Sequence, residues 1–263
     1  MYKNSRKIVF FALSFLLSLA QFLPINIFGQ ALNATSDLDF NYYHSDSNQQ
    51  IVQKYNLEID EEWNYFLENI SVQPLSIVTE KRSTYVPLKR QERSYWCGPA
   101  SVQMVLLSIK GTSPSQSTLA SSAYLNTNTG GTYVYKIVEV LKKFTTGYKY
   151  LNLKDTGLWL SVWSSLGKKA PTIYHVRTGV LPHYTKNLGH YVVGYEAILK
   201  YDTNIISPQS TTSLFNPDVD PISGVSFSLS YKDPYTLVPG DVTTSLEIMT
   251  QAIRNHSGYW IAK

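Results

Sequence analysis

The chain has 263 residues, of which 43% are hydrophobic, 16% are charged and only one is a cysteine. This composition excludes a disordered chain and one embedded in a membrane throughout, and the single cysteine excludes a disulfide framework and a cysteine-rich zinc site. The formal net charge of +4 includes +3 from residues 1–31, so the rest of the chain, at +1, gives no reason to expect a nucleic-acid partner.

Residues 1–31 have the layout of a secretory signal peptide. A basic start precedes a long apolar stretch, and residues 29–31 (Gly-Gln-Ala) place small side chains where a signal peptidase cleaves. An uncleaved membrane anchor is the alternative, but Pro24 and Asn26 interrupt the apolar stretch and favour a cleaved signal. No later segment reaches the roughly 18 apolar residues of a membrane span. We therefore expect a secreted chain, extracellular or associated with the cell surface.

An acidic segment, residues 32–82, precedes a basic domain, residues 83–263. The segment has nine acidic and three basic residues, a net charge of −6, whereas the domain has a net charge of +7. Four apolar residues recur in the segment at helical spacing: Trp63, Phe66, Leu67 and Ile70. The acids at 60–62 favour the start of that helix. The segment is expected to be either a helical arm packed on the domain or a removable prosegment, released near Lys81-Arg82 or Lys89-Arg90.

Residues 83–263 suit a single domain with helices first and strands later. Helical patterns occupy residues 98–110, 115–124, 133–144, 158–166 and 244–254. Strand patterns occupy residues 171–176, 190–199 and 225–232. Thr244 and Glu247 form a capping box for the last helix, and residues 202–224 read as a long polar loop. Helices followed by strands, rather than strict alternation, indicate an α+β fold.

The only cysteine lies at the start of the first of these helices. Pro99 suits the first helical position, and Gly111 can end the helix. Cys97 then lies at the helix N-terminus, where free N–H groups and the helix dipole stabilise a thiolate. A buried, inert cysteine is the alternative. Gln91, six residues upstream, is either a surface residue or a donor to a developing oxyanion beside the Cys97 backbone N–H.

A cysteine nucleophile needs a base and a residue that orients the base. The chain has five histidines: His44, His175, His183, His190 and His256. His190 begins a strand pattern 93 residues after Cys97, so it can lie across a cleft from the helix tip, although a structural role is open for each histidine. Asp233 ends a strand on its apolar side, where an acid needs a partner such as an imidazolium. Asp202 is the rival orienting residue, although a turn role suits it better.

Four segments together resemble the papain-type cysteine peptidases, and more narrowly the secreted, stand-alone relatives of the bacteriocin-leader peptidases (peptidase C-39-like). These segments are Gln91, YWCGPASVQMVL from Tyr95, GHYVVGY from Gly189 and KDPY from Lys232. The resemblance extends over about residues 86–237. It implies a papain-like α+β fold, with the nucleophile at the N-terminus of a helix that packs on an antiparallel sheet.

The resemblance also implies the role of each site residue. Cys97 would be the nucleophile, His190 the base, Asp233 the residue that orients His190, and Gln91 a donor in the oxyanion hole. The 43 residues between His190 and Asp233 exceed the usual gap in such peptidases, and the long loop expected at 202–224 accounts for the difference.

The function implied is hydrolysis of peptide bonds in a peptide or protein substrate through a Cys-His-Asp triad, without a metal or an organic cofactor. Two alternatives remain open from the sequence. One is an acyl transferase or amidase that uses the same triad, and the other is a catalytically silent secreted binding protein on the same fold.

Overall fold

The computed structural model describes residue 39 and residues 42–68, 77–203 and 224–263. The chain divides into two compact units, Met1–Asp37 and Leu38–Lys263, and every described residue belongs to the second. The expected signal peptide and nearly all of the expected polar loop therefore lie outside the described residues. Within the described ranges, no helix is both long enough and apolar enough to cross a membrane.

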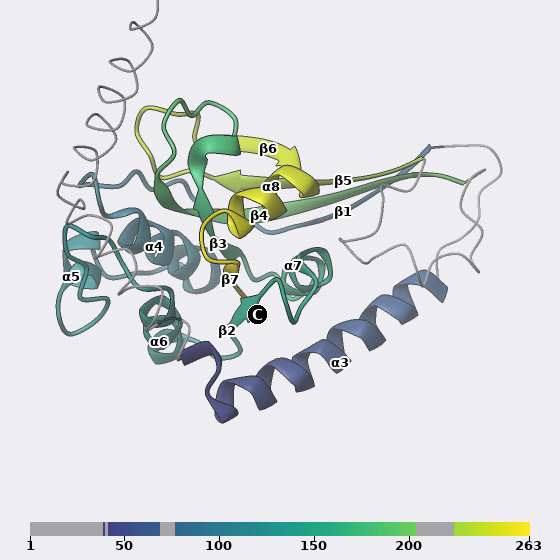
Figure 1. Ribbon diagram of the computed structural model, residues 1–263, viewed down its shortest axis with the longest axis horizontal. Helices are drawn as coiled ribbons and strands as arrows, with labels where there is room; N and C mark the ends of the chain where they lie inside the picture. Colours follow the sequence, from purple (N-terminus) through teal and green to yellow (C-terminus); the bar gives the residue numbers. More distant parts are fainter. Residues whose placement is uncertain (1–38, 40–41, 69–76, 204–223) are drawn as a thin grey trace, which may run out of the picture. The chain divides into compact units, whose positions relative to one another are not determined.

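Helices and antiparallel strands make up the second unit (Figure 1). The helices are α3 (Asp46–Glu68), α4 (Cys97–Lys110), α5 (Gln116–Ala120), α6 (Val134–Phe144), α7 (Leu158–Gly167), the short 3₁₀ helix η2 (Thr178–Val180) and α8 (Leu246–Arg254). The strands are β1 (Ile77–Ser83), β2 (Lys149–Asn152), β3 (Thr172–Arg177), β4 (Gly189–Asp202), β5 (Val225–Lys232), β6 (Asp241–Ser245) and β7 (Tyr259–Ala262). In Figure 1, α4, α5 and α6 are grouped together, and the long strands β1, β4 and β5 extend away from them.

The described strands form one antiparallel sheet in the order β2-β7-β3-β4-β5-β6, and β1 pairs with β4 beside this path. Strand β4 is long enough to serve two partners on one edge: its first half pairs with β3 and its second half with β1. The register against β5 shifts between Gly194 and Glu196, where β4 changes partner. The fold is therefore the expected α+β arrangement, with a helical part packed on an antiparallel sheet.

The expected helices and strands are all present, although their limits and one cap differ. Helix α8 begins at Leu246, and its cap is Ser245, whose side chain accepts a hydrogen bond from the backbone N–H of Ile248. The predicted capping box of Thr244 and Glu247 is wrong, because Thr244 belongs to strand β6 and pairs there with a residue of β5. The strands β1, β2, β6 and β7 were not expected.

Helix α4 begins one residue before the predicted range of 98–110 and two residues before the position expected from Pro99. Cys97 is its first residue, so Pro99 is the third and not the first. Proline is tolerated at that place because the N–H groups of the first helical turn have no partner within the helix. Gly111 ends the helix as expected, in the left-handed conformation with φ of 72°.

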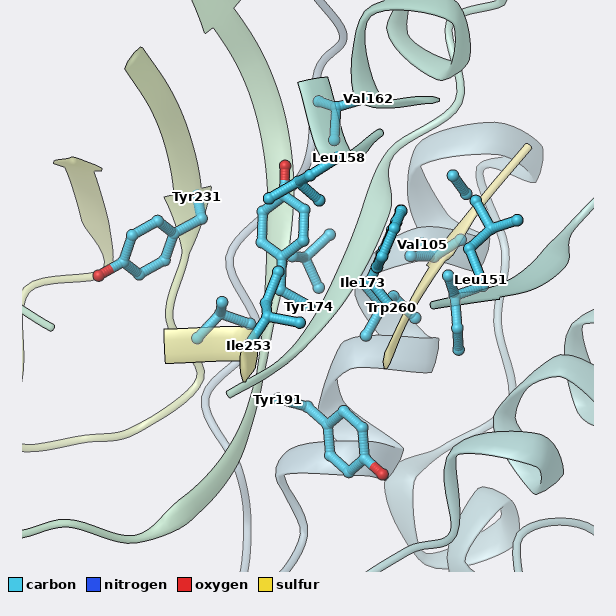
Figure 2. Close-up of a cluster of buried hydrophobic side chains, with 14 of the residues drawn as sticks. Val105, Leu151, Leu158, Val162, Ile173, Tyr174, Tyr191, Tyr231, Ile253 and Trp260 are labelled. Carbon is cyan, nitrogen blue, oxygen red and sulfur yellow. The ribbon is translucent and has the colours of Figure 1, made fainter. Parts of the chain in front are cut away.

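The core lies where the helices meet the sheet (Figure 2). Figure 2 shows side chains from α4, α7, α8 and four strands gathered around β3. Its labelled members are Val105, Leu151, Leu158, Val162, Ile173, Tyr174, Tyr191, Tyr231, Ile253 and Trp260. These buried side chains form one cluster and give the domain the continuous apolar interior that a sheet and its covering helices require.

Helix α3, the predicted helix of the acidic segment, is part of this core. It starts earlier than the sequence pattern indicates and presents one apolar face to α7 and β2. Among the described residues of the segment, the buried apolar side chains are Tyr43, Val52, Tyr55, Ile59 and Trp63. Trp63 meets the Trp163 ring of α7 edge to face, with centroids 6.0 Å apart. Figure 1 shows α3 running alongside α7.

Residue Asp39 ties the start of the same segment to helix α6. Its carboxylate accepts hydrogen bonds from the backbone N–H groups of Tyr135 (2.9 Å) and Val134 (3.4 Å), so it caps the first turn of α6. Burial raises the pKa of Asp39 to about 6, even though these two N–H groups act in the opposite direction. The packing thus continues across the boundary expected at residue 82, which falls inside strand β1. Removal of residues 32–82 stays a prediction.

Candidate active site

Cys97 lies at the N-terminus of α4 with its thiol free and only 8% of its surface exposed. The residue before it, Trp96, makes no side-chain cap, so the first N–H groups of α4 are not satisfied from that side. Those groups and the helix dipole create a positive potential around the sulfur. The residue after it, Gly98, fits closely against Thr132, since a Cβ at Gly98 would lie 2.5 Å from the Thr132 Oγ1.

His190 is the second residue of β4 and is buried, at 6% exposure. Its register against Val176 of β3 fixes the backbone, and its Nε2 lies 2.9 Å from Oδ1 of Asp233. Cys97 lies close enough to the same imidazole to raise its pKa. Because Nε2 faces Asp233, Nδ1 is the ring nitrogen that remains for the sulfur. The structure thus brings together the three residues that the sequence places in the site: Cys97, His190 and Asp233.

The charge state of His190 follows from these neighbours. Burial alone would lower the pKa of His190, but the hydrogen bond to Asp233 and the neighbouring Cys97 and Asp233 charges raise it to about 9. The imidazole is therefore held in its protonated form at neutral pH. A protonated imidazole beside a sulfur is the arrangement that stabilises a thiolate.

Asp233 follows directly after β5 and is completely buried. Its backbone N–H donates to the Gly240 carbonyl (3.0 Å), which closes a turn around it. Its Oδ1 accepts a second hydrogen bond from the backbone N–H of Tyr235 (2.9 Å), and its Oδ2 accepts one from the Tyr184 hydroxyl (2.8 Å). The rival Asp202 lies at the far end of β4, twelve residues from His190, and pairs there with β1, so it does not orient His190.

Gln91 is buried, but its side chain is engaged by the backbone. Its amide nitrogen donates to the carbonyls of Arg93 (3.0 Å) and Ser94 (2.9 Å), which uses both N–H groups. Its backbone N–H donates to the Pro234 carbonyl (2.9 Å). In this arrangement Gln91 shapes the turn that leads to Cys97, and its role as an oxyanion donor, which requires one N–H to leave the turn, stays a prediction.

Arg90 joins the segment before α4 to the turn after β5. Its guanidinium donates to the carbonyls of Asp233 (3.2 Å), Val238 (3.0 Å) and Tyr235. Gln116 of α5 supports the same segment by donating to the Arg90 carbonyl (2.7 Å). These contacts hold the segments of Cys97 and Asp233 together. In the sequence, Arg90 is notable only as half of a dibasic pair, and no local pattern indicates that it joins these two segments.

Among the described residues, no hydrogen bond joins Cys97 to His175, His183 or His256. His175 stacks on the Tyr191 ring, with centroids 4.3 Å apart, and meets the His256 ring at 3.6 Å. Burial and the neighbouring His256 lower the pKa of His175 well below its usual value, and burial lowers the pKa of His256 to about 4. His183 lies in the exposed loop before β4. Among the described residues, no group of three or more His, Cys, Asp or Glu side chains could hold a metal ion.

The chain is similar to one family of known proteins and to solved peptidase structures. Residues 83–207 match the model of the Peptidase_C39 like family, a range that contains Gln91, Cys97 and His190 and ends before Asp233. The peptidase domain of Streptococcus ComA, a bi-functional ABC transporter involved in a quorum sensing pathway, has 22% identity and a TM-score of 0.41, over 67% of this chain and 96% of that one. A double glycine motif protease from an AMS/PCAT transporter, solved with the leader peptide, has 18% identity and a TM-score of 0.41, over 72% of this chain and 97% of that one. No curated protein matches the chain.

Proposed function

We propose that this chain hydrolyses peptide bonds with Cys97 as nucleophile, His190 as acid and base, and Asp233 as the residue that orients His190. The match of residues 83–207 to the Peptidase_C39 like family supports a peptidase. One observation carries the proposal. The buried imidazole of His190 has Asp233 on one ring nitrogen, at 2.9 Å, and lies close enough to Cys97, at the N-terminus of α4, for that residue to raise its pKa. That set of contacts is the one a thiolate nucleophile needs.

The reaction begins with the Cys97 thiolate attacking the carbonyl carbon of the scissile peptide. The backbone N–H of Cys97 receives the oxyanion, and Gln91 would add a second donor if its amide turned toward the substrate. His190 then gives its proton to the leaving amine, the carbon–nitrogen bond breaks, and an acyl enzyme forms on the sulfur. The neutral imidazole next takes a proton from water, whose oxygen attacks the acyl carbon. The carbon–sulfur bond then breaks, the acid leaves, and the Cys97 thiolate and the His190 imidazolium are restored. Loss of one oxyanion donor should cost roughly 10²–10³ in rate.

The expected substrate is a peptide or a protein. The test is hydrolysis of a broad peptide library by the wild-type chain and by Cys97→Ala, each with and without iodoacetamide. Because the chain has one cysteine, iodoacetamide can alkylate only Cys97. We expect hydrolysis by the untreated wild type alone, and nearly equal thermal stability for the two chains.

The same assay separates the alternatives. Hydrolysis that survives in Cys97→Ala would overturn the proposal, and unfolding of that variant would identify Cys97 as a core residue instead. An added amine that appears in the product in place of water would identify an acyl transferase. A folded wild-type chain that binds peptides and cleaves none would be a binding protein.

We also propose that the chain is secreted after cleavage behind Ala31. The basic start, the apolar stretch and the small residues at 29–31 support this. Mass spectrometry of the chain recovered from the growth medium should find Leu32 as the first residue. An intact Met1 in the membrane fraction would contradict the proposal.

A further inference from the structure

The carboxylate of Asp233 has three hydrogen-bond donors, and only one of them is the catalytic imidazole. Oδ1 accepts from His190 (2.9 Å) and from the Tyr235 backbone (2.9 Å), while Oδ2 accepts from the Tyr184 hydroxyl (2.8 Å). Tyr184 is therefore the side chain that decides which oxygen of the carboxylate faces His190.

Tyr184 reaches this position from the loop between η2 and β4, six residues before His190. Its ring stacks on the Tyr235 ring, with centroids 5.9 Å apart and an angle of 15° between planes, and lies 5.9 Å from the imidazole. Burial and the adjacent Asp233 charge raise the pKa of Tyr184 above its ordinary value. The hydroxyl consequently keeps its proton and remains a donor throughout the working pH range.

We propose that Tyr184 is a positioning residue for the peptidase reaction: its hydroxyl holds Oδ2 of Asp233 so that Oδ1 stays in line with His190. This inference rests on the proposed function, because it concerns the same triad. No feature of the segment HYTKN marks Tyr184 in the sequence, since its partner lies 49 residues away.

The carboxylate of Asp233 is fully buried. Without the Tyr184 hydroxyl, Oδ2 would be a charged acceptor with no partner in an apolar site, which is costly. The carboxylate would then rotate or admit water to satisfy Oδ2, and its bond to His190 would weaken. Because that bond helps to keep the imidazole protonated, its loss should lower the pH at which His190 releases its proton.

The experiment compares Tyr184→Phe with a matched control, Tyr124→Phe. Tyr124 is also half-buried and stacks on a neighbouring ring, that of Phe144, at 5.9 Å, but it lies outside the active site. For Tyr184→Phe we expect a roughly 10- to 100-fold loss in kcat with little change in KM, as for removal of a hydrogen bond to a charged group. We also expect the alkaline limb of its kcat profile to move to lower pH, whereas Tyr124→Phe should match the wild type in both respects.

A Tyr184→Phe enzyme with wild-type kcat and an unmoved alkaline limb would overturn the inference, while an inactive Cys97→Ala would still uphold the proposed function. An active Cys97→Ala would instead remove the proposed function itself. Should Tyr184→Phe fail to fold, the comparison is made between Tyr184→Gln and Tyr184→Leu, whose side chains are similar in size to each other. The inference expects the Gln variant, which keeps an N–H donor, to be the more active, and equal activity would overturn it.

Discussion

Truncation of Trp63 measures whether helix α3 belongs to the fold in solution. The Trp63 side chain is 5% exposed and packs against the rings of Phe66 (4.9 Å) and Trp163 (6.0 Å). Removing a buried tryptophan side chain costs about 3–5 kcal/mol, from lost burial and from the cavity that remains. For a domain of this size each kcal/mol corresponds to about 2–4 °C in Tm, so Trp63→Ala should lower Tm by roughly 6–20 °C.

The assay is thermal and urea unfolding of the full chain, with Tyr65→Ala as the control. Tyr65 lies two residues away on the same helix and is 69% exposed, so its truncation should change the free energy of unfolding by only about 0.5 kcal/mol or less. If Trp63→Ala unfolds at the same temperature and urea concentration as the wild type and Tyr65→Ala, α3 does not pack on α7 in solution. The segment would then behave as a detachable arm, and the account of the core given above would be refuted.

Three further predictions concern the site and its supports. Because the pKa of His190 is raised to about 9, the imidazolium is lost as the pH rises through that value, so kcat/KM should fall on the alkaline side near pH 9. A fall centred near the ordinary histidine value would mean that Asp233 and Cys97 do not hold the imidazole as the structure has it. Asp39→Ala removes the cap of α6 and should lower the free energy of unfolding by about 0.5–2 kcal/mol in urea, whereas no change would show that the cap is not made. Gly98→Ala should lower kcat/KM by roughly 10- to 100-fold, because its Cβ would collide with Thr132 and shift the start of α4. Gly157→Ala, whose Cβ would have its nearest neighbour at 3.9 Å, should not change kcat/KM, and equal rates for both variants would contradict the steric argument.

The parts of the site that could be predicted from the sequence are those with a local signal. Cys97 is followed by a helical pattern that places it at a helix tip, and Asp233 continues the alternation of a recognisable strand. His190 could be selected because a strand pattern starts there. In each case a chemically active side chain lies beside a regular element whose period is visible in the sequence.

The supports of the site have no such local signal. Tyr184 and Arg90 act on Asp233 and its turn from 49 and 143 residues away, and Asp39 caps a helix 96 residues further along the chain. Contacts of this kind depend on how the strands pair, which single-sequence patterns do not specify. Strand β1 illustrates the same limit, because none of its side chains is fully buried and its pairing with β4 comes from the backbone.

Gln91 illustrates a different limit of sequence reasoning. Its spacing from Cys97 is that expected of an oxyanion donor, yet both of its N–H groups serve the carbonyls of Arg93 and Ser94. A spacing rule specifies where a residue lies and not which acceptor its side chain selects. Buried amides take the nearest acceptors, and here the turn before α4 supplies two.

The central claim is that His190 activates the Cys97 sulfur, and the rate of alkylation by a peptide bearing a thiol-reactive electrophile at neutral pH tests it most directly. Intact mass spectrometry follows the growth of the Cys97 adduct in the wild type, in His190→Ala and in the control His183→Asn. His183 is an exposed loop histidine with a φ of 69°, and asparagine tolerates this conformation. The account predicts rapid labelling of the wild type and of His183→Asn, and labelling of His190→Ala that is slower by a factor on the order of 10² or more. Equal labelling rates in all three chains would contradict it.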